Sequence, residues 1–527
     1  MIILKTTTLV AILSCMSSVA GAPPSKAPPS STPAGTAPTG GSTPAKTTQS
    51  GKASLPAAVE PVATVVEVTN SNAPLNQLNV WLKNINSKNR GCTVLWPAWV
   101  KATPMPGDGS VPMPAEIWSG MTDWAAWQTW ASQNGDLAKA LKDARNALAL
   151  GVAYGDVGVS AANQSKGLVA LPGSAMGEAA FPYLKAVRGL AAFAIVQMRA
   201  LGDSGKYQEA FDVALDGLRM LRNAAEQRMA SEQIVALSLL ASSLEAHRVF
   251  MADHLDKIPH QVLQDVAKKG YPFLKAGDNE RLKRLELPEG DRLVAEVSLG
   301  EVFTPSGQGD PEKFASAFGA MQSDSTPLTR FGAAAFWRKA AEMHGSLEST
   351  RERLGNVYDD WWRRWRMRFY DPLVEQPSEF SLVNPARYAA VRLLLSDLTR
   401  VFSLRLKVIA ELDGSMDAAG LCAFRGDNGK QWPRDLAQIF PLYAMQKLNM
   451  DPFNKLYGTF QYRNVGEKPQ AIDTQWGQVI ATGALLWSVG GDHEDGNFSK
   501  HDPPDGLGDV VMWPPPRQLA QRAGLIK

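Results

Sequence analysis

Acidic residues gather in a glycine-rich loop close to the C-terminal end of the sequence. They are Asp492, Glu494, Asp495, Asp502, Asp505 and Asp509. Glycines before, between and after these residues let the backbone bend, so that several carboxylates can converge. Carboxylate oxygens are the hard ligands that Ca²⁺ prefers, and the ion typically takes about six to eight oxygens. The loop is therefore either a calcium site or a solvated acidic segment that binds no ion.

Two histidines in the same loop give a third interpretation. His493 and His501, together with neighbouring carboxylates, have the ligand types of a transition-metal site, but their spacing matches no known ligand motif. Neither Cys92 nor Cys422 belongs to a CxxC pair, so cysteine adds nothing to a metal hypothesis. In an oxidising compartment these two cysteines can instead form one disulfide.

The sequence contains no catalytic signature. We find no nucleophile elbow, Walker loop, Rossmann glycine fingerprint or zincin helix. The glycine-rich residues 151–158 lack a Lys-Ser or Lys-Thr pair, and we interpret them as a helix end and a loop. His247, His254 and His344 are single histidines in helical segments, a setting typical of structural histidines. We assign no catalytic and no cofactor-binding residue; the enzyme hypothesis stays open, and a non-catalytic protein is the first expectation.

The elements that position the acidic loop follow one another in a defined order. Apolar residues recur at spacings of three and four over residues 388–412, which predicts a long helix. Turn-forming residues follow at 427–433 (DNGKQWP) and at 449–454 (NMDPFN). Alternation over residues 458–463 predicts a strand. The apolar residues 485–490 then lead into the acidic loop, which ends in the segment GDVVMWP.

This order of elements resembles the globular part of the major pseudopilins of type II secretion. Those proteins place a long helix before a DNGxYP turn, a DPFGxPxxYR strand entry, a YSxGxDG turn and an Asp-Ile-x-x-Trp exit. The resemblance covers residues 401–513 and implies a small α+β module that holds a calcium ion in its last loop. The ligands that it implies are the carboxylates of Asp492 and Asp509, the carbonyl of Leu486, and the hydroxyl or carbonyl of Ser488.

Some features depart from the pseudopilin pattern. Trp432 stands where the first turn usually has Tyr, and the acidic loop is long. The N-terminus lacks a prepilin processing site and an unbroken apolar helix, so we expect a protein that does not polymerise into a pseudopilus. The chain also resembles a group of large uncharacterised exported proteins of planctomycete-type bacteria, which place such a tail behind a helical, repeat-like body.

Helical patterns dominate the region before the tail. Residues 181–201 and 208–226 predict two helices joined by the turn GDSGKY, and this pair resembles one unit of a tetratricopeptide repeat. Residues 231–250 predict another amphipathic helix, but the repeat motif does not recur at the repeat period. We therefore expect an array of repeat-like antiparallel helical hairpins.

One tryptophan-rich helix precedes these hairpins. Trp124, Trp127 and Trp130 recur every three residues, so they occupy one arc of a helix. Flat rings in a row can form a platform for carbohydrate, which is the alternative interpretation. We favour core packing, because a narrow stripe of large rings is typical of a buried helix face.

A second tryptophan-rich helix is predicted over residues 347–369. Trp362, Trp365 and Phe369 share one face, which we expect to be packed. Interleaved arginines suit either a polyanion or membrane surface, or pairing with acidic residues of the same helix. Those acidic residues are Glu352, Asp359 and Asp360. We favour internal pairing and a solvated polar face.

The N-terminal residues predict export. Residues 1–20 have the positive charge, short apolar stretch and small residues of a signal peptide, with cleavage expected after Ala20. In the alternative interpretation, Cys15 lies in a loose lipobox and is acylated, which tethers the protein to a membrane. Residues 21–60 are rich in Pro, Ala, Ser, Thr and Gly, a composition typical of a disordered linker.

The full prediction is a mainly α protein. Residues 61–380 form the repeat-like helical domain, and residues 381–527 form a long helix and the small α+β pseudopilin-like module. The formal net charge of +2 argues against a nucleic-acid partner. We expect no transmembrane helix in the mature chain and a periplasmic, extracellular or envelope-associated location. The expected function is that of an interaction or scaffold module for an unknown protein or envelope partner, with a secreted hydrolase or glycan-binding protein as the alternative.

Overall fold

Most of the chain after residue 72 is described by the computed structural model. The described residues are 73–107, 110–156, 158–173, 179–271, 285–323, 330–367, 371–395, 398–444, 449–456, 458–501 and 508–526. The predicted signal peptide, the predicted linker, Cys15, Asp502 and Asp505 lie outside these residues.

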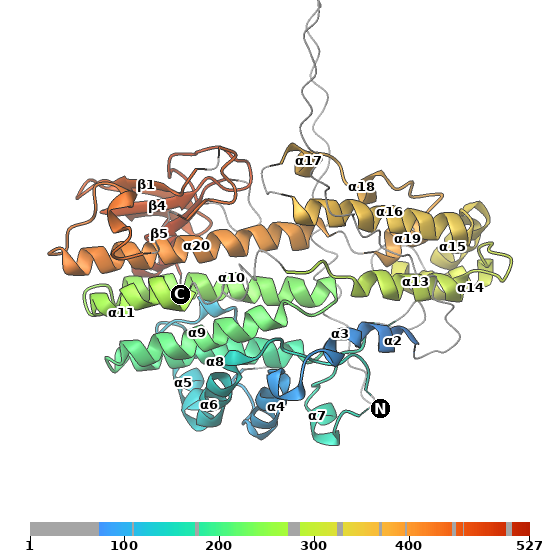
Figure 1. Ribbon diagram of the computed structural model, residues 1–527, viewed down its shortest axis with the longest axis horizontal. Helices are drawn as coiled ribbons and strands as arrows, with labels where there is room; N and C mark the ends of the chain where they lie inside the picture. The colour runs from blue at the N-terminus through green and yellow to red at the C-terminus, as the bar shows by residue number, and fades with distance from the viewer. Residues whose placement is uncertain are drawn as a thin grey trace, which may run out of the picture.

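Long helices stacked side by side form the centre of the molecule (Figure 1). They are α8 (Leu184–Asp203), α9 (Tyr207–Ala224), α10 (Ala230–Asp253) and α20 (Thr399–Asp427). α8 and α9 form a hairpin, and α10 lies between this hairpin and α20. α10 is long and apolar enough to cross a membrane, but 78% of its most apolar window is buried inside the fold.

Small residues let these helices approach closely. A Cβ atom on Gly217 of α9 would lie 2.7 Å from the Cβ atom of Ala194 on α8. A Cβ atom on Gly202 of α8 would lie 2.3 Å from a ring carbon of Phe250 on α10. The predicted hairpin and the helix after it are therefore confirmed, with slightly different ends, whereas the tetratricopeptide resemblance stays a prediction.

The N-terminal elements cover the outer side of the hairpin (Figure 1). They are α2 (Ala73–Leu78), α3 (Val80–Lys83), η2 (Ser87–Asn89), α4 (Cys92–Lys101), η3 (Pro114–Glu116), α5 (Trp124–Gln133), α6 (Gly135–Asp143), η4 (Ala144–Asn146) and α7 (Ala161–Ser165). Trp127 and Trp130 of α5 are each 3% exposed, and Trp124 packs half-buried against the same core. The prediction of a buried stripe is confirmed, and these rings form no open carbohydrate platform.

A further group of helices forms the end of the molecule opposite the sheet (Figure 1). They are α13 (Gly290–Val302), α14 (Pro311–Ser323), α15 (Arg330–Met343), α16 (Leu347–Arg366), α17 (Pro372–Glu375), α18 (Glu379–Leu382) and α19 (Ala389–Leu394). After α10, the chain first forms α11 (His260–Asp265) and the π-helical turn η5 (Val266–Gly270), both of which pack against α20.

The buried face of α16 differs from the predicted one. Tyr358, Trp361 and Trp365 are buried, whereas Trp362 is only half-buried and Phe369 lies outside the described residues. The predicted face is confirmed in part: Trp365 is buried and Trp362 packs half-buried against the core. Trp361, which the prediction left out, is buried as well, because it contacts Phe402 of α20 together with Trp365.

The arginines of α16 include one that is buried. Arg364 pairs with Asp360 at 2.8 Å and donates to the carbonyls of Val374, Gln376 and Pro377. This pairing confirms that an arginine of this helix has an internal, structural role.

The helix predicted over residues 388–412 is divided in the structure. α19 ends at Leu394, where Leu395 is extended, and α20 starts at Thr399 and continues to Asp427. The sequence pattern ended too early because the last turns of α20 bury small and polar residues instead of a periodic apolar stripe. A Cβ atom on Gly414 would lie 2.6 Å from Cγ of Met512, so this glycine lets the tail pack directly on α20.

The tail is a small antiparallel region seated on α20. β1 (Gln461–Asn464), β4 (Ala484–Ser488) and β5 (Val510–Trp513) form a sheet in the order β1-β4-β5. β2 (Gln470–Thr474) and β3 (Gly477–Ala481) form a separate hairpin. The short helices η6 (Leu436–Ile439) and α21 (Pro516–Arg522) complete it. The fold is therefore mainly helical with a small antiparallel region near the C-terminus, as predicted; the pseudopilin likeness stays a prediction.

The hydrophobic core continues from the body into the tail. One cluster of buried residues extends from Leu78 to Trp513, and a smaller cluster fills the space around Ile472, Trp487 and Phe498. The division at residue 380 stays a prediction, but α20, which lies after it, packs both on α10 of the body and on β4 and β5 of the tail. The body and the tail therefore share packing along α10 and α20.

The disulfide that the sequence left open between Cys92 and Cys422 does not form. Cys92 and Cys422 are both free thiols. Cys92 lies at the start of α4 and its Sγ is 3.2 Å from the carbonyl of Gly151, whereas Cys422 is buried inside α20. Burial raises the pKa of both thiols, to about 11 for Cys92. These thiols behave as buried packing groups.

Candidate functional site

The implied calcium ligands occupy two different environments. Leu486 is buried in β4, the central strand, and pairs with Tyr462 of β1 and Trp513 of β5. The hydroxyl of Ser488 donates to Asp451 at 2.9 Å and accepts from the backbone N–H of Gly490. The side chain of Ser488 is therefore already engaged within the tail.

Asp451 organises the turn after β4, a role that the sequence did not reveal. This carboxylate is 1% exposed and accepts from the N–H groups of Phe453 and Val489, each at 3.0 Å, as well as from Ser488. Burial raises the pKa of Asp451, while these donors act in the opposite direction. In the sequence, the only indication of this role was the position of Asp451 in the DPF segment. Its partners Ser488 and Val489 lie far along the chain, so the local sequence does not identify them.

Asp509 and Asp492 lie in the second environment, inside the acidic loop. Asp509 is 3% exposed, and its two oxygens accept the N–H groups of Gly496 and Phe498 at 3.0 Å. Burial raises the pKa of Asp509 to about 6, and the negative charges of Asp495 and Asp492 add to this effect. The carboxylates of Asp492 and Asp495 are therefore close enough to Asp509 to disfavour its negative charge.

These contacts fit a hard cation in part. Asp492, Asp495 and Asp509 offer oxygen donors whose mutual repulsion a cation would relieve. The hydroxyl of Ser488 does not fit, because it is bound to Asp451. Among the described residues, no group of three or more His, Cys, Asp and Glu side chains has the arrangement of a metal site.

The two loop histidines contact backbone atoms instead of each other. Nδ1 of His493 lies 2.5 Å from the carbonyl of Phe453. Nδ1 of His501 accepts the N–H of Val511 at 3.2 Å. These contacts give the histidines structural roles in the tail and leave the transition-metal interpretation without support from geometry.

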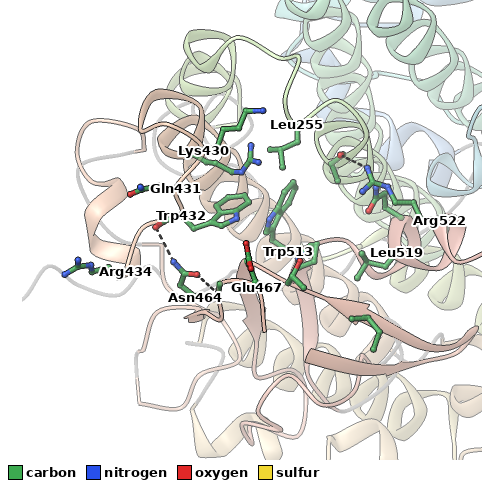
Figure 2. Close-up of a pocket in the computed structure, with 18 residues that line it drawn as sticks. Leu255, Lys430, Gln431, Trp432, Arg434, Asn464, Glu467, Trp513, Leu519 and Arg522 are labelled. Carbon is green, nitrogen blue, oxygen red and sulfur yellow. Dashed lines mark hydrogen bonds between the residues drawn. The ribbon is translucent and has the colours of Figure 1, made fainter. Parts of the chain in front are cut away.

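A cavity of about 640 Å³ lies where the tail meets the body, and we call it the junction pocket (Figure 2). Four separate stretches of chain contribute to its lining: the end of α10, the end of α20 with the turn after it, the β-rich part of the tail, and the middle and end of α21. In Figure 2, Trp432 and Trp513 flank the cavity between Leu255 on one side and Glu467 on the other. Its volume lies within the range of roughly 300–1,000 Å³ that is usual for small-molecule sites.

The floor of the junction pocket is aromatic and apolar. Trp513 is 2% exposed, and the half-buried ring of Trp432 lies 6.1 Å from it, at an interplanar angle of 60°. Leu255 and Leu519 are half-buried in the wall, and Ile480 is 52% exposed beside them. Gly483 has a φ of +80°, and a Cβ atom there would lie 2.5 Å from the indole nitrogen of Trp432, so glycine leaves room for this ring.

The rim of the junction pocket is mostly cationic. Arg425, Lys430, Arg434 and Arg522 line it, with Glu467 as the one carboxylate among the lining residues. Since the whole chain has a formal net charge of only +2, this concentration of positive charge is local.

The cations of the rim differ in how they are held. Arg425 donates to Asp256 at 2.7 Å and lies over the ring of Trp432, with 5.3 Å to its centroid. Lys430 also pairs with Asp256, at 3.4 Å. Arg434 is exposed and forms no ion pair with any residue in the described part of the chain. One cation is therefore left open to a ligand, while others are fixed in place.

A second cluster of polar groups is sealed inside the body. Glu232, at the start of α10, is fully buried and accepts from the hydroxyls of Tyr154 at 2.6 Å and Tyr183 at 2.5 Å. Burial raises the pKa of Glu232 to about 7, although these hydrogen bonds act against the shift. Because the described lining of the junction pocket includes none of these residues, we interpret the cluster as structural.

Comparison with known proteins gives no further assignment. No family model matches this sequence, and the searches of curated proteins and of solved structures found no match either. The resemblances stated from the sequence therefore stay predictions, and the function has to be argued from the geometry.

Proposed function

We propose that this is an exported, non-catalytic interaction protein of the cell envelope that binds its ligand in the junction pocket. The observation that supports this proposal is the composition of the pocket: aromatic rings on the floor, cations on the rim and an exposed arginine without an ion-pair partner in the described chain. Concave sites with an apolar floor and a few convergent polar groups are the usual place for a ligand.

The attachment of the tail supports a preformed site. Arg517 of α21 pairs with Glu245 of α10 at 2.7 Å. Arg522 donates to the carbonyl of Ala252, again on α10. Ordering costs are lower when the groups that contact a ligand are already fixed. Because these contacts hold the tail on the body, the two sides of the pocket face each other before a ligand arrives.

A calcium ion belongs to the proposed function as a stabilising cofactor of the tail. Asp492 and Asp509, the two carboxylates that the resemblance implied, are the acidic residues of this loop that would hold it, and the charge of Asp492 acts on Asp509. The ion would offset the repulsion among their carboxylates and fix the loop against β4. It has no proposed role in the junction pocket.

Ligand binding tests the proposal directly. The mature protein is incubated with immobilised glycans and peptidoglycan fragments of the bacterial envelope, and binding is compared with that of Trp432→Ala and of Trp124→Ala. Trp124 is the matched control, because it is also half-buried but lies on α5, away from the pocket. We expect Trp432→Ala to lose binding and Trp124→Ala to retain it. Equal binding by both variants would contradict the proposed site.

The hydrolase alternative depends on Glu467. Glycosidases generally use two carboxylates, and Glu467 is the one carboxylate among the described lining residues of the pocket. Release of reducing ends from envelope glycans by the wild-type protein, abolished in Glu467→Gln, would favour the hydrolase over a binding protein. We expect no release by either protein.

A further inference from the structure

We infer that the junction pocket takes a saccharide that carries a carboxylate, such as a uronic-acid oligosaccharide. This inference rests on the proposed binding function and adds the chemical class of the ligand. It is argued from the charges of the rim, the rings of the floor and the mixture of donors and acceptors around them.

The charges of the rim select an anion. Arg434 is exposed with no ion pair in the described chain and extends outward from one side of the rim, and Arg522 lies on the opposite side of the cavity (Figure 2). Arg522 is held by the carbonyl of Ala252 and, in the amide orientation that satisfies both groups, by Gln518. A guanidinium presents paired donors that match the two oxygens of a carboxylate. Arg434 can thus pair with a negative charge of the ligand without losing another partner, and Arg522 presents a guanidinium that is already held in place.

The floor selects a ligand with a flat, weakly polar face. Trp432 is half-buried, so part of its ring stays open to the cavity, and Trp513 supports it from below. The guanidinium of Arg425 lies over the same indole, while Asp256 fixes this arginine. The C–H face of a pyranose ring packs on such an aromatic surface, whereas an extended acidic peptide has no equivalent face.

The remaining rim groups require a ligand that also donates hydrogen bonds. Glu467 is exposed at the pocket, and its carboxylate only accepts. Gln431 and Thr482 are exposed lining residues that both donate and accept. Sugar hydroxyls satisfy such groups in either direction. A dense polyphosphate offers no donors and is repelled by Glu467 and Asp256, so the rim favours a carboxylated sugar over a phosphate polymer.

Calorimetric titration of the mature, full chain tests this inference. The probes are a tetragalacturonate, a neutral tetrasaccharide of glucose, and a glutamate-rich peptide of similar charge. The variants are Arg434→Gln, Trp432→Ala and, as a matched control, Arg463→Gln. Arg463 is also exposed in the tail but does not line the pocket.

We expect tetragalacturonate to bind more tightly than the other two probes and to weaken as salt is added. Arg434→Gln should weaken binding by about tenfold, as expected for the loss of one charge-assisted hydrogen bond. Trp432→Ala should weaken it as well, and Arg463→Gln should leave it unchanged.

The other outcomes separate the two levels of the proposal. If neutral and acidic sugars bind with equal affinity, and Trp432→Ala reduces both affinities, the proposed binding function is supported. The inference that the ligand carries a carboxylate is then overturned. Tighter binding of the peptide would overturn the saccharide class alone. Absence of binding by every probe at millimolar concentration, with cooperative melting that shows a folded protein, would overturn both.

Discussion

Replacement of Glu232 by Gln should change how the stability of the protein depends on pH. Glu232 is fully buried at the N-terminus of α10, where it accepts from Tyr154, Tyr183 and the backbone N–H of Met229. Glutamine keeps the size of the side chain and can still cap the helix, since either residue type serves in a capping box. The substitution therefore removes a titrating proton with little change in packing.

The size of the effect follows from the pKa of this carboxyl group. Burial raises the pKa from 4.5 to about 7, and each pH unit corresponds to about 1.4 kcal/mol. The folded state holds its proton more tightly than the unfolded state. The resulting stability is complete below pH 4.5 and is lost as the pH rises to about 7, for a total of about 3 kcal/mol.

Urea denaturation followed by tryptophan fluorescence measures this difference. Between pH 4.5 and about 7, the free energy of unfolding of the wild-type protein should fall by about 3 kcal/mol relative to Glu232→Gln. Tyr183→Phe serves as the control, because it removes one donor to the carboxylate and should move the fall to higher pH. Parallel curves for the wild-type protein and Glu232→Gln would refute the argument that burial controls this group.

Four further outcomes are expected. Burial lowers the pKa of His247 to about 3, so the wild-type protein should lose stability as the pH falls below 6.5, and His247→Asn should lose less in acid denaturation. Gly414→Ala should destabilise the protein by about 1–3 kcal/mol through contact with Met512, and Met512→Ala should relieve that loss in a double-mutant cycle. Arg248→Met should cost about 3–5 kcal/mol by chemical denaturation, because it leaves the buried carboxylate of Glu411 without its partner. Calcium should raise the melting temperature of the wild-type protein, and chelator should lower it.

The calcium prediction has a matched set of variants. Asp509→Asn and Asp492→Ala should abolish the shift in melting temperature caused by calcium. Asp451→Asn should lower the melting temperature in calcium and in chelator alike, because Asp451 holds Ser488 and Val489 and is not one of the proposed ligands. A calcium shift that survives in Asp492→Ala and in Asp509→Asn would show that the ion, if bound, lies elsewhere.

Local patterns in the sequence predicted the helices whose burial is periodic. Trp127 and Trp130 were assigned to the core from spacing alone, and the structure buries both. The same reasoning ended α20 too early, because Gly414, Ser415 and Asp417 interrupt the apolar stripe although all three are buried. Periodicity detects apolar burial; it does not detect polar or small residues that are buried by a neighbouring element.

Contacts between distant segments lay beyond prediction. Asp451 meets Ser488 and Val489 only after the sheet has formed, and nothing in its local sequence identifies these partners. The junction pocket is a stronger case, since Leu255 follows the C-terminal end of α10 and Trp432 follows the C-terminal end of α20, and these two ends meet only when the helices pack together. Such a site follows from tertiary packing, for which a single sequence without a known relative carries no local signal.

Because α21 packs on α10, ligand binding in the junction pocket requires that the tail stay docked on the helical body. The junction pocket exists only while Arg517 holds Glu245 and the tail is docked on the body. A ligand that binds only when the tail is docked also stabilises the docked tail. The free energy by which docking strengthens ligand binding equals the free energy by which the ligand opposes release of the tail. Protease cleavage near the tail should therefore slow when the pocket is filled, and a truncated chain that lacks α21 should fail to bind even if its helical body folds normally.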